Sequence, residues 1–288
     1  MLRNEGDPLR RVIVCSPQKE FFRVKDKKSH NITLVAERDA ARKQHAELKK
    51  ALEDFGSEVV HIAELPGHPN SVFTRDTAVC TPRGFIRLRM GLPSRAGEAL
   101  WMTEKLLALG ILPAGEIFAP GTAEGGDIIL VGSTAFIGAS SRTNAEGIRQ
   151  LKDILGSMDY EVRVAAVPKP YLHIGGAMSM LGPRRVLCCR DVFPEDFFRG
   201  YEKIEIPASD FISGNVICLG NNEVIADSSN TEAINRLEKA GITVRVLDLS
   251  EFVKGTGGPS CLIMPVDRAI THPSFKFSPR SPATGQKI

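Results

Sequence analysis

The chain has 288 residues with 37 Lys or Arg and 34 Asp or Glu, and its formal net charge of +3 is too small to argue for nucleic-acid binding. Its 42% hydrophobic and 25% charged residues exclude an intrinsically disordered chain, and no apolar run approaches the ~20 residues of a membrane span. The polar first residues are unlike a signal peptide, and six scattered cysteines are unlike a secreted disulfide framework, so we expect a cytoplasmic location.

One plan recurs five times along the chain: an apolar strand or hairpin, a polar helical stretch and a further short apolar strand. The two clearest copies start near 127 and 216. The first of these has a hairpin at 127–138, an amphipathic helix at 142–158 and a strand at 160–167. The second has a hairpin at 216–226, a helix closing at Gly241 and a strand at 242–247.

The other three copies are looser. The first runs from a strand at 12–14 through a helix ending at Phe55 to a strand at 59–62. The second is expected to begin with a strand at 72–73 and to continue through 85–86 into a helix from Ser94. The remaining copy has apolar strands at 178–181, 186–187 and 204–206.

Repeated units that cannot bury an apolar face alone must pack on one another, and five of them would close into a ring with the functional residues at its centre. The alternative is that the units resemble one another only by chance. In that case we would expect an open α/β sheet. No linker divides the chain, so we expect one domain over residues 1–270. The segment 271–288 contains three prolines and no periodicity, which predicts an extended or partly disordered tail.

Cys261 is the candidate nucleophile. It follows the glycine-rich run GTGGPS and precedes an apolar strand, which places its thiol at the end of a turn rather than within a packed element. The ordinary role of a cysteine is that of a small buried hydrophobe. The other five cysteines lie in strand patterns and fit that role: Cys15, Cys80, Cys188, Cys189 and Cys218.

One histidine and three acidic residues complete the candidate site. His173 opens a repeat unit at a position facing the ring centre, although a structural histidine would fit the same place. Asp76 in FTRDTA, and Glu124 and Asp127 in EGGD, adjoin buried-type residues, where an unpaired carboxylate is costly. These carboxylates therefore need a cationic partner, either an arginine of the protein or a cationic ligand.

The motifs FTRDTAV, EGGD followed by SSRTNAEG, LHIGGAMSMLGP and GTGGPSC occur in an order that resembles the guanidine-modifying superfamily of arginine deiminases, dimethylarginine dimethylaminohydrolases and amidinotransferases. The likeness spans residues 10–268. It implies an α/β fold, a single-domain five-bladed αβ propeller with its site in the central channel. It also implies that Cys261 is the nucleophile, His173 the general acid/base and Glu124 the catalytic carboxylate.

The resemblance also implies the substrate contacts. Asp76 matches the aspartate that holds the guanidinium, and Arg89 and Arg142 match arginines that hold the substrate carboxylate. Asp127 takes a supporting position, and Asn70 stands where some relatives carry an aspartate that helps to bind the amino group. The implied chemistry is attack of a thiolate on a guanidinium carbon through an S-alkylthiouronium intermediate, which needs no metal or organic cofactor.

Position 175 separates the subfamilies. Arginine deiminases and amidinotransferases resemble one another in carrying an aspartate there, whereas Gly175 leaves room beside a guanidinium nitrogen and favours an Nω-methylated arginine, giving citrulline and an alkylamine. Arg75 favours the alternative, hydrolysis of free arginine or another guanidino acid, because FTRD resembles the arginine deiminases. A propeller that only binds guanidines or proteins is a less favoured alternative, and a papain-like hydrolase would carry its cysteine early in the mature chain.

The expected partner is a small guanidino substrate, with no nucleic acid and no membrane. The helical face at 36–52 would suit a homodimer, but packing within the chain explains it equally well.

Overall fold

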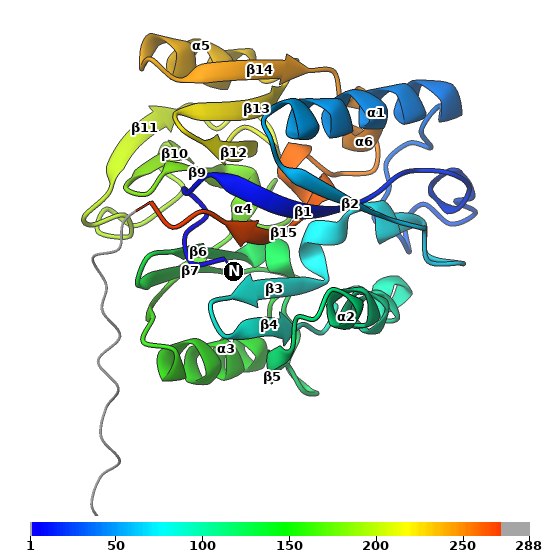
Figure 1. Ribbon diagram of the computed structural model, residues 1–288, viewed down its shortest axis with the longest axis horizontal. Coiled ribbons are helices and arrows are strands. Elements are labelled where there is room, and N and C mark those ends of the chain that lie inside the picture. The colour runs from blue at the N-terminus through cyan, green and yellow to red at the C-terminus, as the bar shows by residue number, and fades with distance from the viewer. Residues whose placement is uncertain (1, 272–288) are drawn as a thin grey trace, which may run out of the picture.

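Five three-stranded sheets surround a common axis in the computed structural model, which describes residues 2–271 (Figure 1). Each sheet is one blade of a propeller, in which one strand pair is antiparallel and the other parallel. The blades are β15 (Ile263–Arg268), β1 (Leu9–Cys15) and β2 (Glu58–Ile62); β3 (Ala78–Thr81), β4 (Gly84–Arg87) and β5 (Pro113–Glu116); β6 (Ile128–Val131), β7 (Thr134–Ala139) and β8 (Glu161–Ala166); β9 (Met178–Gly182), β10 (Arg185–Cys189) and β11 (Glu202–Ile206); and β12 (Val216–Gly220), β13 (Glu223–Asp227) and β14 (Thr243–Leu247).

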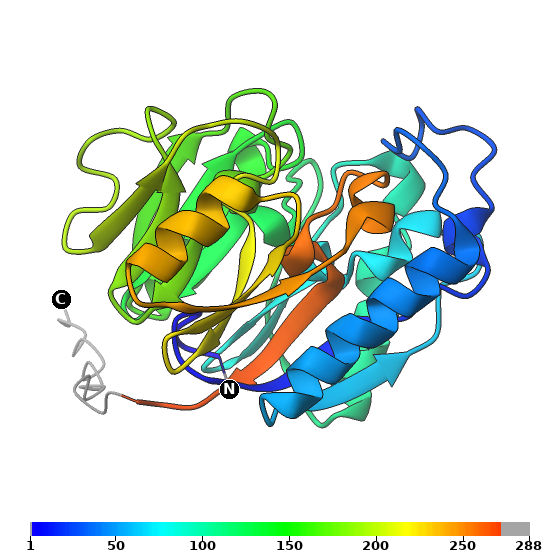
Figure 2. The same cartoon turned by 90° about the horizontal axis from the view of Figure 1, so that it is seen from above.

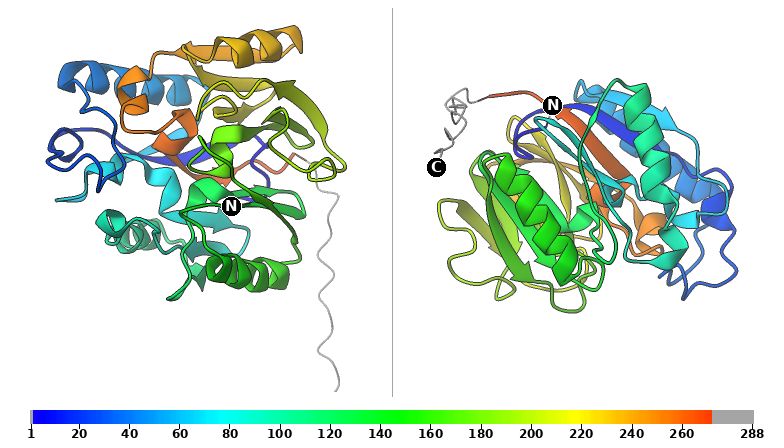
Figure 3. Two further views of the ribbon diagram at one scale, coloured as in Figure 1. Left: turned by 180° about the vertical axis from the view of Figure 1, so that it is seen from behind. Right: turned by 90° about the horizontal axis from the view of Figure 1, so that it is seen from below.

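Helices cross from the second to the third strand in four of the five blades. They are α1 (Arg38–Asp54), α2 (Glu98–Ala108), α3 (Ala145–Ser157) and α5 (Thr231–Lys239). They lie on the outer side of the ring, with α1 and α5 toward one side (Figure 2) and α2 and α3 toward the other (Figure 3). The buried side chains of α1, which include Leu48 and Leu52, face its own chain, so packing within the chain explains this apolar face, and a homodimer stays a prediction.

In the blade of β9, β10 and β11, an aromatic loop replaces the helix. Phe193 and Phe197 stack with ring centroids 5.2 Å apart, and Phe197 packs 5.1 Å from Phe136 of β7. Aromatic pairs at this separation bury a large apolar area. The loop therefore covers this blade and joins it to the preceding one.

The end of the described chain closes the ring. β15 pairs antiparallel with β1, so that Val12 faces Pro265 and Ile13 faces Met264. Arg268 extends the closure to β12, because its Nη1 donates to the backbone oxygen of Cys218 at 2.8 Å. The repeat pattern predicts the strand at 12–14 but not this partner, which lies about 250 residues away, since a propeller blade can combine the two ends of a chain.

Most predicted elements are confirmed, with one displaced strand. The helix predicted at 142–158 is α3, and it starts where the side chain of Asn144 accepts a hydrogen bond from Gly147 N at 2.8 Å. The strand expected at 72–73 is wrong: this segment forms short 3-10 turns, and β3 begins only at Ala78. The reason is that backbone groups of this segment form their hydrogen bonds with side chains and turns rather than with a neighbouring strand. Arg95, for example, donates to Phe73 O at 3.0 Å. The helix expected from Ser94 begins at Glu98.

Other sequence expectations concern cysteines, membranes and the tail. All six cysteines are free, and five of them are buried in strands as expected. Among residues 2–271, none of the helices combines the length and apolarity needed to cross a membrane. The tail predicted at 271–288 lies, apart from its first residue, outside the described residues.

Candidate active site

Five turns, each just before the first strand of a blade, bring one polar side chain apiece to one end of the ring. Asp76 precedes β3, Glu124 precedes β6 and His173 precedes β9, while Cys261 precedes β15. The fifth turn, before β12, carries Asn215, which no sequence pattern distinguishes. The prediction that His173 opens a unit at the ring centre is confirmed by this arrangement.

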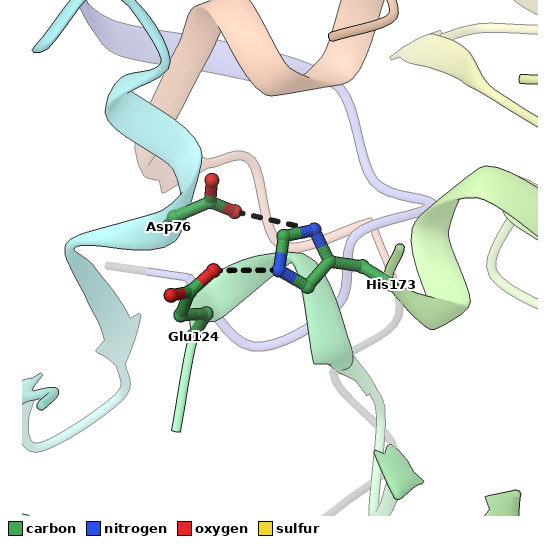
Figure 4. A group of neighbouring side chains, drawn as sticks. All are labelled: Asp76, Glu124 and His173. Atoms are coloured by element: carbon green, nitrogen blue, oxygen red, sulfur yellow. Dashed lines mark hydrogen bonds and ion pairs between the residues drawn. The ribbon is translucent and has the colours of Figure 1, made fainter. Parts of the chain in front are cut away.

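His173 lies between two carboxylates (Figure 4). Its Nε2 is 2.8 Å from Glu124 Oε2, and its Nδ1 is 3.8 Å from Asp76 Oδ1. Burial alone would lower the pKa of His173, but the carboxylates of Asp76, Asp127 and Glu124 raise it to about 9. The imidazole is therefore protonated at neutral pH.

Glu124 is fully buried and ionised. Burial disfavours its charge, yet the hydrogen bond and the charge of His173, with Arg95 and Arg142 nearby, lower its pKa to about 2. Its Oε1 accepts a hydrogen bond from Gly91 N at 3.0 Å. Glu124 can therefore hold the imidazolium in a fixed orientation over a wide pH range.

Cys261 sits in the short 3-10 turn Pro259–Leu262, where its backbone N donates to Gly258 O at 3.1 Å. It lines two small cavities that also share His173. Burial, and then the negative charge of Asp76, raise the pKa of this thiol to about 12. At neutral pH the sulfur is therefore a neutral thiol. A cation placed beside Asp76 would offset the negative charge that helps to raise the pKa of this thiol.

Arg95 supplies the cationic partner that Asp76 needs, and sequence reasoning missed it. Its Nη1 donates to Asp76 Oδ2 at 2.6 Å, and its Nη2 donates to Glu98 Oε2 at 2.7 Å. Asp76 Oδ1 remains directed toward His173 and accepts from Gly126 N at 3.2 Å. One oxygen of Asp76 is therefore paired with Arg95, and the other, held by Gly126 N, faces His173.

The cavity on the Arg95 side of Cys261 has a volume of about 20 Å³. Arg142 lines it, with Nη1 3.6 Å from Glu124 Oε1. Asn70 also lines it, and its buried Oδ1 has no hydrogen-bond partner among the described residues. Arg89 has an exposed side chain that donates to Gly121 O at 3.2 Å and is not part of this lining. The structure thus brings Arg142 and Asn70 to the site and places Arg95 there instead of Arg89.

Asp127 stands behind His173. Its Oδ2 accepts from Ser140 Oγ at 2.6 Å and from Thr143 Oγ1 at 2.7 Å, and its Oδ1 accepts from Ile174 N at 2.9 Å. Burial raises the pKa of this carboxyl to about 6. The bond to Ile174 N fixes the residue that follows His173. This placement suits a supporting role for Asp127.

The cavity on the other side of Cys261 extends along the axis, with a volume of about 50 Å³. Gly175 and His173 line its reactive end, and apolar side chains such as Met178 and Ile263 line its middle. Arg75 lines it too, but its Nη2 donates to Glu5 Oε1 and to Ile128 O, both at 2.8 Å. Arg75 is thus committed to structural bonds with the N-terminal segment.

Asp76, Glu124 and His173 could also hold a metal ion, because they offer ligand atoms within 4.8 Å of one another. A metal would have to displace the proton of His173, whose pKa is raised to about 9. The same three groups already satisfy one another as ion pairs, and this favours a proton-transfer site.

A family model described as N,N dimethylarginine dimethylhydrolase, eukaryotic, matches residues 15–268. The chain belongs to the dimethylarginine dimethylaminohydrolase family. Members of this family are hydrolases that act on carbon–nitrogen bonds of amidines.

One relative of this chain is the N(G),N(G)-dimethylarginine dimethylaminohydrolase of Pseudomonas aeruginosa, which is 32% identical over 222 residues. The matched region covers 77% of this chain and 87% of that enzyme. A solved structure of the P. aeruginosa enzyme, a cysteine-to-serine mutant complexed with citrulline, has a TM-score of 0.79 at 28% identity and covers 89% of this chain and 99% of that one. The arginine deiminase of Listeria innocua is 26% identical, covering 69% of this chain and 62% of that enzyme. The five-bladed propeller expected from the sequence is confirmed by these neighbours.

Proposed function

We propose that this protein hydrolyses an Nω-methylated arginine to citrulline and an alkylamine through an S-alkylthiouronium intermediate on Cys261. The observation that carries the substrate choice is the axial cavity beside Cys261 and His173, whose wall at Gly175 has no side chain. An alkyl group on the reacting nitrogen would enter this space, where Met178 and Ile263 offer apolar contacts. The similarity to dimethylarginine dimethylaminohydrolases supports the same choice.

Binding orients the substrate between two ends of the site. Asp76, through the oxygen directed toward His173, and the carboxylate of Glu124 keep the guanidinium protonated and in plane through charge-assisted hydrogen bonds. Arg142 provides the positive charge for the substrate carboxylate in the 20 Å³ cavity, because Arg95, which also lines it, is already paired with Asp76 and Glu98. Arg89 stays a predicted carboxylate contact, and Asn70 Oδ1 offers a neutral acceptor to the amino group.

The bound cation lowers the cost of ionising Cys261, because its charge offsets that of Asp76. The Cys261 thiol releases its proton to water, the thiolate attacks the guanidinium carbon and a C–S bond forms. His173 then gives a proton to the substituted nitrogen, and the C–N bond breaks with release of the amine. Water attacks the thiouronium carbon while His173 takes up one of its protons; the C–S bond then breaks as the ureido carbonyl forms, and the remaining hydroxyl proton passes to the sulfur to regenerate the thiol.

A panel of guanidines tests the substrate. We expect kcat/KM for Nω-methylated arginine to exceed that for arginine by at least about tenfold, since only the former fills the axial cavity. Agmatine should be poor because it lacks the carboxylate. Ureido product and released amine are measured separately. Equal turnover of arginine would favour the arginine deiminase alternative, and no turnover of any guanidine would favour a binding protein.

Gly175→Asp should weaken or abolish the preference for methylated arginine. The new side chain occupies the wall of the axial cavity, and its Cβ would lie 3.1 Å from Gly126 O, so a small backbone adjustment suffices. We expect the ratio of kcat/KM for methylated arginine to that for arginine to fall by about tenfold or more.

The matched control is Gly182→Asp, at the far end of the same blade, where an added Cβ meets no atom within 4 Å. This change should leave the ratio unaltered. A ratio that stays constant in Gly175→Asp would show that the axial cavity does not receive the substituent.

A further inference from the structure

Asn215 occupies the one position of the five-turn ring that the proposed mechanism leaves unused. It lies directly before β12, as Cys261 lies before β15 and His173 before β9. Only 2% of its surface is exposed. A buried amide must place both its acceptor and its donors in hydrogen bonds, so its partners indicate what it holds.

The partners of Asn215 are the two turns that carry the proposed nucleophile and the proposed acid. Its Oδ1 accepts from Ser260 N at 2.9 Å, and its Nδ2 donates to Gly175 O at 2.9 Å. The same Nδ2 is 4.0 Å from Cys261 Sγ. One amide therefore connects the residue before Cys261 to the turn of His173 and retains a second N–H for the sulfur.

Close backbone packing fixes this amide in place. A Cβ at Gly258 would lie 2.7 Å from Asn215 Cγ, and a Cβ at Gly214 would lie 2.3 Å from the carbonyl carbon of Ala177. Gly214 N also donates to Gly176 O at 2.9 Å. The three turns thus approach one another too closely at Gly214 and Gly258 to admit even a Cβ, so a movement of the amide would also displace the turn of Cys261.

We propose that Asn215 is a positioning residue that holds Cys261 Sγ against His173 and donates a hydrogen bond to the sulfur once it becomes a thiolate. The inference rests on the proposed function, in which Cys261 is the nucleophile. The N–H to sulfur contact is long in the unliganded site, and such contacts tighten in the reacting complex. The charged groups around the sulfur are Asp76, Arg75, Arg95 and His173, and Asn215 adds a neutral donor to this set.

Asn215→Asp tests this role, because it keeps the shape and the acceptor but replaces the donor by a carboxylate oxygen. The rate of alkylation of Cys261 by iodoacetamide is measured from pH 6 to 10, with Cys261→Ser as the blank. We expect the pKa of the Cys261 thiol to rise by at least about one unit. At a fixed pH below that pKa, the alkylation rate should then fall at least about tenfold. In turnover, kcat should fall more than KM rises.

Asn230→Asp is the matched control. Its Nδ2 donates to Ser213 O at 2.8 Å and to Ile212 O at 3.2 Å, so it holds the same turn from the side away from Cys261. This variant should lose comparable hydrogen bonds and leave the alkylation profile unchanged. A profile that moves equally in Asn230→Asp, or that does not move in Asn215→Asp, overturns the proposal.

Asn215→Ala covers the case in which the aspartate variant fails to fold. It removes the connection without adding a charge, and we expect kcat to fall about tenfold or more with KM changed less than about threefold. A wild-type KM and kcat in this variant would contradict the positioning role. Alkylation requires no guanidine, so this assay decides the role of Asn215 even if the proposed substrate proves wrong.

Discussion

Replacing Cys261 with serine should lower turnover of the preferred guanidino substrate to less than about a thousandth of the wild-type rate. An alcohol ionises far less readily than a thiol, and His173 is already protonated at neutral pH because its pKa is raised to about 9. His173 therefore cannot serve as the base that activates the serine. The exchange of sulfur for oxygen is nearly isosteric, so Tm should change by only about 2 °C or less.

Turnover is measured from the ureido product, and folding from the calorimetric transition. Cys80→Ser is the control, because this cysteine is buried inside β3 and lines neither of the two cavities beside Cys261. The control should keep turnover within about threefold of wild type while losing some stability. Activity of Cys261→Ser above a thousandth of wild type would show that the nucleophile is another group.

The parts of the site that local sequence predicts are those in which a turn leads directly into a buried strand. Glu124 and Asp127 sit in a glycine turn before the clearest hairpin, and Cys261 follows a glycine-rich run before β15. Such patterns report backbone conformation and burial, both of which are local properties. The positions of these side chains at the ring centre therefore followed from the repeats.

The parts that sequence could not predict depend on contacts between distant segments. Arg89 and Arg95 are six residues apart, and their spacing does not tell which of them turns inward. The short 3-10 turn Pro93–Arg95 decides it, by directing Arg95 to Asp76. Asn215 was overlooked because amides are common in turns, and only its partners in two other blades distinguish it. The strand expected at 72–73 failed because apolarity alone does not show where a polar backbone finds its hydrogen bonds.

Glu124→Gln should lower kcat by about a hundredfold or more and shift its pH dependence. The mechanism needs His173 protonated to release the amine, and in the substrate complex the bound cation already favours the Cys261 thiolate, so kcat should fall as the pH rises through about 9, the raised pKa of His173. Glutamine keeps the shape of Glu124 but removes the anion that stabilises the imidazolium. The pKa of His173 then falls, and the alkaline limb moves to lower pH.

The thermal stability of the protein should also decrease as the pH rises through the pKa of His173. The folded pKa of His173 is raised to about 9 from an ordinary 6.5, so its contribution is fully present below pH 6.5 and is lost as the pH rises through 9. In Glu124→Gln the part of this contribution due to Glu124 is absent, and the loss of Tm between pH 6.5 and 9 should be smaller. Glu124 itself, with a pKa lowered to about 2 from 4.5, stabilises the wild type above pH 4.5, and this contribution is lost as the pH falls through 2.

Glu5→Gln separates this effect from the general cost of breaking a buried ion pair. Glu5 pairs with Arg75 at 2.8 Å inside the same ring and contacts neither His173 nor Cys261 directly. Its loss should lower Tm but leave the alkaline limb near pH 9, because the carboxylates that raise the pKa of His173 are Asp76, Asp127 and Glu124. A limb that stays near 9 in Glu124→Gln would mean that Asp76 and Asp127 alone hold the proton on His173, and Glu124 would then act on the substrate cation rather than on the acid.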